Sequence, residues 1–150
     1  MKKVIKRTLI ILGLLTIGVW FYSGSLIGVE KEAKVAYKKL KKEIKDEGFR
    51  PKIFVISGKR WNLDNQIFTR LSGASKNSQH LNGKAIDIII LDVNEDGEVD
   101  GKDVDLVYQI LEEKILNGSG GVGTYKNEKG FLNKQMIHFD LRKNKSRWNR

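Results

Sequence analysis

The segment "KAIDIIILDV" (84–93) constrains the fold of this 150-residue chain more than any other part of it. It holds a short run of branched apolar residues, which predicts a buried β-strand. Asp87 stands inside this run, and His80 precedes it by seven positions. The chain has only one other histidine. The strand therefore brings a rare imidazole close to a carboxylate, with Gly83 between them to permit a tight turn.

The other hydrophobic patterns predict a small α+β domain in which helices and strands alternate. The expected helices are 29–48, 62–73 and 102–116, and the expected strands are 52–58, 84–93 and 136–142. In the last strand, alternation places His138 and Asp140 on one face and Ile137 and Phe139 on the other. The glycine-rich stretch 118–123 is expected to be flexible.

The composition limits the chemistry that the chain can perform. It has no cysteine, which excludes disulfides and thiolate metal sites. The formal net charge is +10, which favours an anionic partner or surface. Nucleic acid and an anionic bacterial envelope both fit this charge, and so does a lysine-coated soluble surface.

The N-terminus predicts export. Residues 1–28 begin with basic side chains and continue with an uncharged apolar run from Thr8 to Gly28, long enough to span a bilayer as a helix. Basic residues before such a run hold the N-terminus in the cytoplasm, so residues 29–150 would lie outside it, on a single-pass membrane protein. The alternative is a cleaved signal peptide and a secreted domain. Either interpretation argues against a nucleic-acid partner, and the oligomeric state stays open.

A metal site is the chemistry that the two histidines suggest. Zinc without cysteine needs about three imidazole or carboxylate ligands and an open position for water. His80 lies in a loop before the strand of Asp87, and His138 lies on another strand. If the two strands are neighbours, the three side chains can converge. The alternative is a pair of unrelated surface or core histidines.

The segment "SQHLNGKAIDI" (78–88) resembles the S-x-H-x-x-G-x-A-x-D motif of the zinc D-Ala-D-Ala peptidases. That family includes carboxypeptidases and cell-wall endopeptidases, and it shares a fold with the signalling domain of hedgehog proteins. Further segments resemble its H-x-D branch in the right order: "ISGKR" (56–60), "GGVGTY" (120–125), "IHFDLR" (137–142) and "RW" (147–148). The resemblance implies a hedgehog-like peptidase domain with a central antiparallel sheet over residues 29–150.

The resemblance also implies roles for single residues. His80, Asp87 and His138 would be the zinc ligands. Arg60 would stabilise the developing oxyanion or hold a substrate carboxylate. Ser78 would bind substrate or hold the loop.

The chain departs from the family at the general base. Many members have a glutamate three residues before the last histidine, where this chain has Gln135, and an amide is no useful base near neutral pH. The H-x-D branch lacks that glutamate too. Asp140 is therefore expected either as the base or as a partner that orients a ligand imidazole. Glu128 is a weaker candidate for the base.

A second motif, "DVNEDGEVDGKD" (92–103), has the ligand spacing of an EF-hand calcium loop and resembles the loops of dockerin modules. The expected calcium ligands are Asp92, Asn94, Asp96, the backbone carbonyl of Glu98, Asp100 and Asp103. The alternative is an acidic loop that is simply solvated.

These patterns together predict a membrane-anchored zinc peptidase, a hydrolase that cleaves peptidoglycan stem peptides as a D,D-carboxypeptidase or endopeptidase. Zn²⁺ and Ca²⁺ are its expected cofactors. The alternative function is a non-catalytic, zinc-containing module that binds the cell wall or signals, and Gln135 keeps this alternative open.

Overall fold

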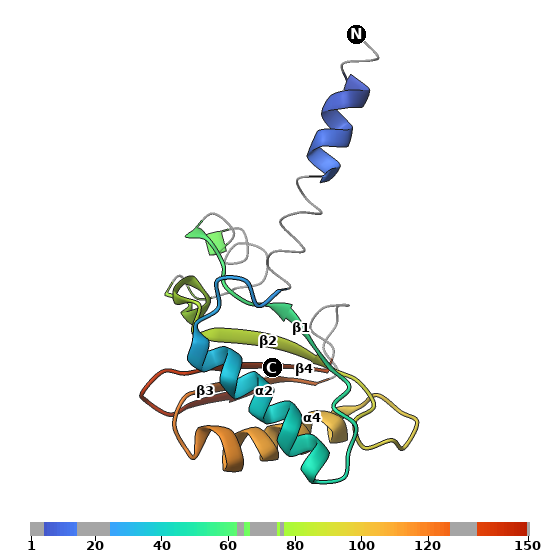
Figure 1. Cartoon of the computed structure of the whole chain (residues 1–150), viewed down its shortest axis with the longest axis vertical. Coiled ribbons are helices and arrows are strands. Elements are labelled where there is room, and N and C mark those ends of the chain that lie inside the picture. Colours follow the sequence, from blue (N-terminus) through green and yellow to red (C-terminus); the bar gives the residue numbers. More distant parts are fainter. Residues whose placement is uncertain are drawn as a thin grey trace.

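The computed structural model describes residues 5–14, 25–62, 65–66, 75, 77–126 and 135–149. In these parts of the chain, one five-stranded sheet carries the fold, with the strand order β1-β2-β4-β3-β5 (Figure 1). The strands are β1 (Ile53–Ser57), β2 (Ala85–Ile90), β3 (Gly121–Tyr125), β4 (Met136–Asp140) and β5 (Ser146–Asn149). The helices are α2 (Lys31–Asp46), the 3₁₀ turn η1 (Gln79–Asn82), α4 (Gly101–Ile110) and its π-helical continuation η2 (Leu111–Leu116), with a further helix at 5–14.

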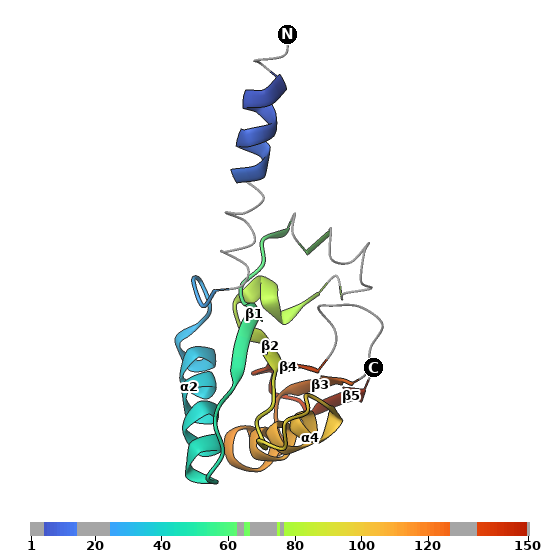
Figure 2. The ribbon, with the colours of Figure 1, turned by 90° about the vertical axis from the view of Figure 1, so that its right-hand side faces the viewer.

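The sheet is antiparallel from β1 to β3, and only the edge strand β5 runs parallel to its neighbour. Helices α2 and α4 lie side by side on one face of the sheet (Figures 1 and 2). Alternate side chains of β2 and β4, among them Ile86, Ile88, Ile137 and Phe139, are fully buried in the core with these helices. The residues between them, including Asp87 and His138, therefore point to the opposite face.

Most of the elements expected from the sequence are confirmed. The predicted helices 29–48 and 102–116 correspond to α2 and to α4 with η2, and the three predicted strands correspond to β1, β2 and β4. The mixed α+β class and the central antiparallel sheet are as expected. The predicted helix 62–73 lies mostly outside the described residues.

The prediction of a flexible glycine stretch at 118–123 is wrong, because Gly121 begins strand β3. The glycines of β3 leave room for neighbouring side chains. A Cβ on Gly121 would lie 2.4 Å from Asp140 Oδ2, and a Cβ on Gly123 would lie 2.2 Å from the ring of Trp148. Glycine inside a strand often marks such a close approach. Strand β5, which carries Trp148, has no counterpart among the expected elements.

The helix at 5–14 exposes its apolar side chains, and Leu9 and Leu14 are each 63% exposed. No helix among the described residues is both long enough and apolar enough to cross a membrane. Residues 15–24 of the expected span lie outside the described residues.

Candidate metal centre

Two neighbouring strands place two of the expected ligands side by side. Asp87 on β2 pairs with His138 on β4 in the antiparallel register. On the other side of β2, the register of β1 shifts between Val55 and Ser57, so that Ser57 lies opposite Asp87. Such an irregularity re-aims side chains and is common next to functional sites.

The third expected ligand comes from the turn before β2. His80 lies in η1, whose first backbone N–H groups are capped by Ser78: its Oγ accepts from the N–H of His80 at 3.3 Å. Gly83 ends η1 in the left-handed conformation, with φ of 69°, and its N–H donates to the carbonyl of His80. This geometry favours the loop-holding role expected of Ser78, and substrate binding by Ser78 stays a prediction.

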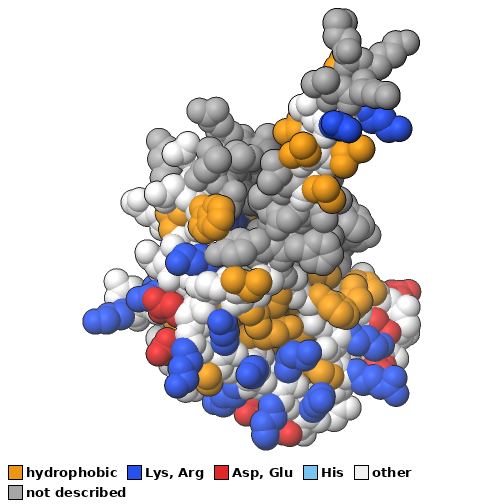
Figure 3. Space-filling model, turned by 45° about the horizontal axis from the view of Figure 1, so that its top comes forward, with side chains coloured by type: hydrophobic (Ala, Val, Ile, Leu, Met, Phe, Trp, Pro, Cys, Tyr) orange, Lys and Arg blue, Asp and Glu red, His pale blue; other side chains and the backbone are white. Residues whose placement is uncertain are grey.

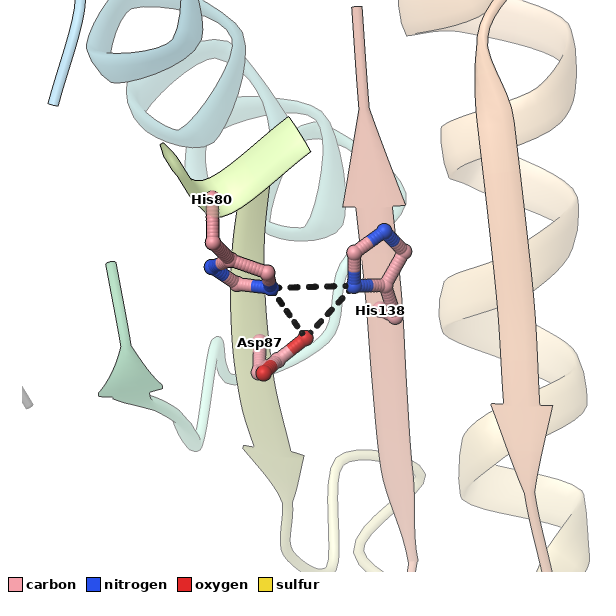
Figure 4. Close-up of side chains that lie close together, drawn as sticks. All are labelled: His80, Asp87 and His138. Carbon is pink, nitrogen blue, oxygen red and sulfur yellow. Dashed lines mark hydrogen bonds and ion pairs between the residues drawn. The ribbon is translucent and has the colours of Figure 1, made fainter. Parts of the chain in front are cut away.

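His80, Asp87 and His138 converge on the face of the sheet opposite α2 and α4 (Figure 4). His80 Nε2 lies 3.1 Å from Asp87 Oδ1 and 3.2 Å from His138 Nδ1, and His138 Nδ1 lies 2.6 Å from Asp87 Oδ1. Within the described parts of the chain, this is the one group of His, Asp or Glu side chains placed to hold a metal ion. The expected convergence of three ligands is therefore confirmed.

The hydrogen bonds behind the two imidazoles fix which nitrogens face the centre. The carbonyl oxygen of Gly58 can only accept, so His80 Nδ1 carries the proton and donates to it at 2.5 Å. His138 Nε2 donates in the same way to Asp140 Oδ2 at 3.1 Å. In neutral imidazoles the nitrogens that face each other, His80 Nε2 and His138 Nδ1, then present lone pairs.

Three lone-pair atoms facing one another repel unless a cation lies between them. Zinc binds imidazole nitrogen and carboxylate oxygen at about 2.0–2.2 Å, which separates tetrahedral ligands by roughly 3.3 Å. Two of the three separations, 3.1 and 3.2 Å, are close to this value, and the third, 2.6 Å, requires a small outward movement of Asp87 or His138. The donor set and its spacing fit a zinc ion.

The electrostatics of Asp87 and His80 agree with this fit, and those of His138 oppose it. Burial alone would raise the pKa of Asp87, but the two imidazoles hold it well below its ordinary value, so the carboxylate stays ionised. Burial lowers the pKa of His80. Burial would also lower the pKa of His138, but its bonds to Asp140 and Asp87 raise it instead. A proton on His138 would therefore compete with a metal, because ligands must be deprotonated.

Arg60 is buried beside the centre, where its Nη2 contacts Asp87 Oδ2 at 2.5 Å and its Nε donates to Ser57 Oγ at 2.9 Å. This arrangement turns the other oxygen of Asp87 toward the histidines. The geometry favours a role in orienting Asp87. The expected contact of Arg60 with substrate stays a prediction.

Asp140 is fully buried on the far side of the His138 ring. Its carboxylate accepts from the backbone N–H of Arg142 at 3.0 Å and from Arg142 Nη2 at 2.6 Å. Burial alone would raise its pKa, but the bonds from His138 and Arg142 lower it far below its ordinary value. Of the two roles expected for Asp140, the geometry favours the orienting one over the general base. Glu128, the weaker candidate, lies outside the described residues.

Trp148 is a neighbour of the centre to which the sequence assigned no role. Its ring lies 5.3 Å from the ring of His138, and its Nε1 donates to the Tyr125 hydroxyl at 3.2 Å. Gly123 pairs with both His138 and Trp148 and leaves room for the indole. The alternating glycines of "GGVG" (120–123) are the sequence signal for this close packing.

The structure does not gather the acidic side chains of loop 92–103 around a common point. Asp103 is buried and accepts from the backbone N–H groups of Val93, Asn94 and Asp100. It thereby closes the loop and completes a capping box with Asp100 at the start of α4. Asp92 Oδ1 is buried and has no hydrogen-bond partner among the described residues. Calcium binding by this loop stays a prediction.

No protein-family model matches the chain, and no curated protein matches it either. Among solved structures, the L-Ala D-Glu endopeptidase ChiX of Serratia marcescens is similar, with a TM-score of 0.50 at 16% sequence identity, over 78% of this chain and 83% of that one. The LdcB LD-carboxypeptidase gives a TM-score of 0.44 at 17% identity, over 75% of this chain and 59% of its own. At this identity the first likeness shows the fold alone: the chain shares its α+β fold with an endopeptidase.

Proposed function

We propose that this chain is a zinc-dependent peptidase that cleaves peptidoglycan stem peptides at the cell envelope. The observation that carries the proposal is the convergence of His80 Nε2, Asp87 Oδ1 and His138 Nδ1 with their lone pairs inward. Three such ligands leave a position open on zinc, as catalytic sites do.

The fold supports the same substrate class. An endopeptidase that acts on an L-Ala–D-Glu bond has this fold over most of its length. The sequence resemblance to the zinc D-Ala-D-Ala peptidases rests on the same residues that the structure brings together. The bond that is cleaved, and the choice between carboxypeptidase and endopeptidase, are left to experiment.

Each residue of the centre has a distinct task in this proposal. Bound zinc would polarise the scissile carbonyl and lower the pKa of a bound water to about 7. His80, Asp87 and His138 would hold the ion. Arg60 keeps Asp87 turned inward, and Asp140 holds His138 with Nδ1 toward the centre.

The alternative function is a zinc-containing module that binds the cell wall or signals without catalysis. Two observations favour it: Gln135 stands where many members of the zinc D-Ala-D-Ala peptidases have their base, and both oxygens of Asp140 are bonded to His138 and Arg142. A peptidase would then have to draw its base from another residue or from the substrate.

Digestion of purified muropeptides separates the two functions. The wild-type protein with zinc should release shortened stem peptides, seen by mass spectrometry, and a chelator should stop the release. His138→Ala should lose both the activity and the bound zinc in elemental analysis. A wild-type protein that holds zinc and cleaves no stem peptide would leave the binding module as the better account.

The export of the domain is also part of the proposal. The apolar run 8–28 would anchor the chain in the cell membrane with residues 29–150 outside the cytoplasm, or be cleaved as a signal peptide. Lysine and arginine side chains are spread over the visible face of the domain (Figure 3). Such a surface suits an envelope rich in anionic polymers.

We further propose that loop 92–103 binds calcium, because of its ligand spacing and because Asp92 Oδ1 is buried without a hydrogen-bond partner among the described residues. Binding to the folded state alone adds about 2.7 kcal/mol at a hundredfold excess over Kd. Asp92→Ala should therefore abolish the rise in melting temperature that calcium causes. Glu98→Gln is the matched control, because Glu98 would offer only its backbone carbonyl. If the melting temperature of the wild type does not change with calcium concentration, the loop does not bind calcium.

A further inference from the structure

Residues 25–30 begin the second described part of the chain and pack against the loops that position His80. Val29 is buried in the core, and the N–H of Glu30 donates to the carbonyl of Gly83 at 2.9 Å. The segment therefore belongs to the domain and is more than a tether.

Gly58 meets this segment on one side of His80. A Cβ on Gly58 would lie 2.4 Å from the carbonyl oxygen of Ser25 and 2.8 Å from Val29 Cγ2. Real Cβ atoms do not approach other atoms this closely. The backbone of segment 25–30 thus fills the space that any larger residue at position 58 would need.

Gly83 meets the same segment on the other side of His80. A Cβ there would lie 2.6 Å from the carbonyl oxygen of Gly28 and 3.3 Å from the nitrogen of Glu30. Gly83 also has a positive φ, which side chains disfavour. A larger residue at position 83 would therefore clash with segment 25–30 and would also be strained by the positive φ.

Both glycines hold His80 through their backbones. The carbonyl of Gly58 accepts the proton of His80 Nδ1, and the N–H of Gly83 donates to the His80 carbonyl at 3.1 Å. A shift of Gly58 would release the bond that keeps His80 Nε2 turned toward Asp87, and a shift of Gly83 would release the backbone of His80. Segment 25–30 thus contacts Gly58 and Gly83, and each of these glycines contacts His80.

We propose that segment 25–30 is a positioning element of the metal centre, which holds Gly58 and Gly83 so that the His80 imidazole presents Nε2 to the ion. The proposal rests on the proposed zinc function. It goes further by making the end of the apolar N-terminal run, residues 25–28, and the two residues that follow it a part of the site, so that anchoring and metal affinity share one segment.

A matched pair of variants at position 30 tests the proposal in the full chain. Glu30→Pro removes the N–H that binds Gly83, and its φ of −60° already suits proline. Glu30→Ala keeps that N–H and loses only the carboxylate. Glu30→Pro should lower zinc affinity by about 10- to 100-fold, the usual effect of losing a partner that orients a ligand, and Glu30→Ala should bind zinc like the wild type.

A second pair tests the other contact. Gly58→Ala should weaken zinc binding by a similar factor, because its Cβ displaces residues 25–29. Adding Val29→Ala should restore part of that affinity, since it removes one of the two clashing groups. Gly101→Ala, where the Cβ meets only the flexible side chain of Lys126, is the control.

Two measurements separate this proposal from the proposed function. Zinc affinity is measured by competition with a chromophoric chelator, and the tautomer of His80 is measured in the metal-free protein by ¹⁵N NMR. Glu30→Pro and Gly58→Ala should also lose the Nδ1–H tautomer of His80. If both keep wild-type affinity and tautomer, the proposal is wrong. If the wild type binds no zinc, the proposed function fails and the tautomer still decides the role of the segment.

Discussion

At the scale of single residues, the centre is built from three converging side chains and from the groups that hold them. The sequence predicted that His80, Asp87 and His138 converge, because a motif of fixed spacing carries His80 and Asp87 and an alternating strand carries His138. It also named Asp140 and Arg60 behind them, but it could not predict the backbone and register contacts. The carbonyl of Gly58 belongs to the backbone and leaves no side-chain signal, and Ser57 faces Asp87 only because the register of β1 shifts.

Asp140→Asn separates the two roles of that residue. If Asp140 orients His138, as its burial and its bonds to Arg142 favour, zinc affinity should fall by about 10- to 100-fold. If Asp140 is the general base, turnover should instead fall by about 10²- to 10⁴-fold with zinc still bound. Chelator competition measures the first quantity, and muropeptide turnover at saturating zinc measures the second. A variant with normal affinity and slow turnover would contradict the orienting role.

At the scale of elements, three neighbouring strands of the sheet, β1, β2 and β4, were predictable, and the other two, β3 and β5, were not. Strands β2 and β4 follow apolar patterns that arise from burial in the core, and such patterns are visible in the sequence. The sequence of β3 is instead determined by its neighbours in the folded structure. Glycine is depleted in strands, and in β3 it is present because the indole of Trp148 and the carboxylate of Asp140 need its space. A requirement set by tertiary neighbours cannot be read from local propensity.

Gly123→Ala tests this account of β3. The added Cβ would lie 2.2 Å from the Trp148 ring, so the indole must leave its place beside His138. Overpacking of this kind costs about 1–3 kcal/mol in the free energy of unfolding, which urea titration measures. Gly101→Ala, at the first position of α4, should be neutral or slightly stabilising. Equal stabilities for the two variants would mean that Gly123 is not needed for space.

The ion pairs that fasten β5 to η2 should make stability depend on pH. Burial would raise the pKa of Glu112, but its bonds from Lys145 and Arg147 lower it below the ordinary carboxyl value. A lowered folded-state pKa stabilises the protein above the unfolded-state pKa, and this contribution is lost as the pH falls through the folded-state value.

Glu112→Gln should therefore lower the free energy of unfolding at pH 7 by about 1–3 kcal/mol and should cost much less in strong acid. Glu113→Gln, the exposed neighbour, is the control. Urea titrations at a series of pH values give the comparison. A loss at Glu112 that is the same at every pH would show that its charge does not contribute.

At the scale of the whole molecule, charge and hydropathy divide the chain in two. Four of its basic residues, Lys2, Lys3, Lys6 and Arg7, precede the apolar run, and no acidic residue occurs before Glu30. The helix at 5–14 leaves its apolar side chains exposed, whereas segment 25–30 is packed into the domain. The proposed membrane surface would thus lie close to the chain that braces His80.

The anchor can be tested by expressing the full chain in a bacterium and separating its membranes. An uncleaved anchor should keep the protein in the membrane fraction through a high-salt wash and at its full mass of 17.1 kDa, because apolar insertion does not depend on salt. A protease added outside cells whose outer barrier has been opened should degrade residues 29–150, since the basic start holds the N-terminus inside. Leu12→Arg with Leu14→Arg should release the chain, because a charge near the middle of a membrane helix costs about 2.5–3.5 kcal/mol. A soluble protein of reduced mass would indicate a cleaved signal peptide, and a full-length protein removed by salt alone would contradict both forms of export.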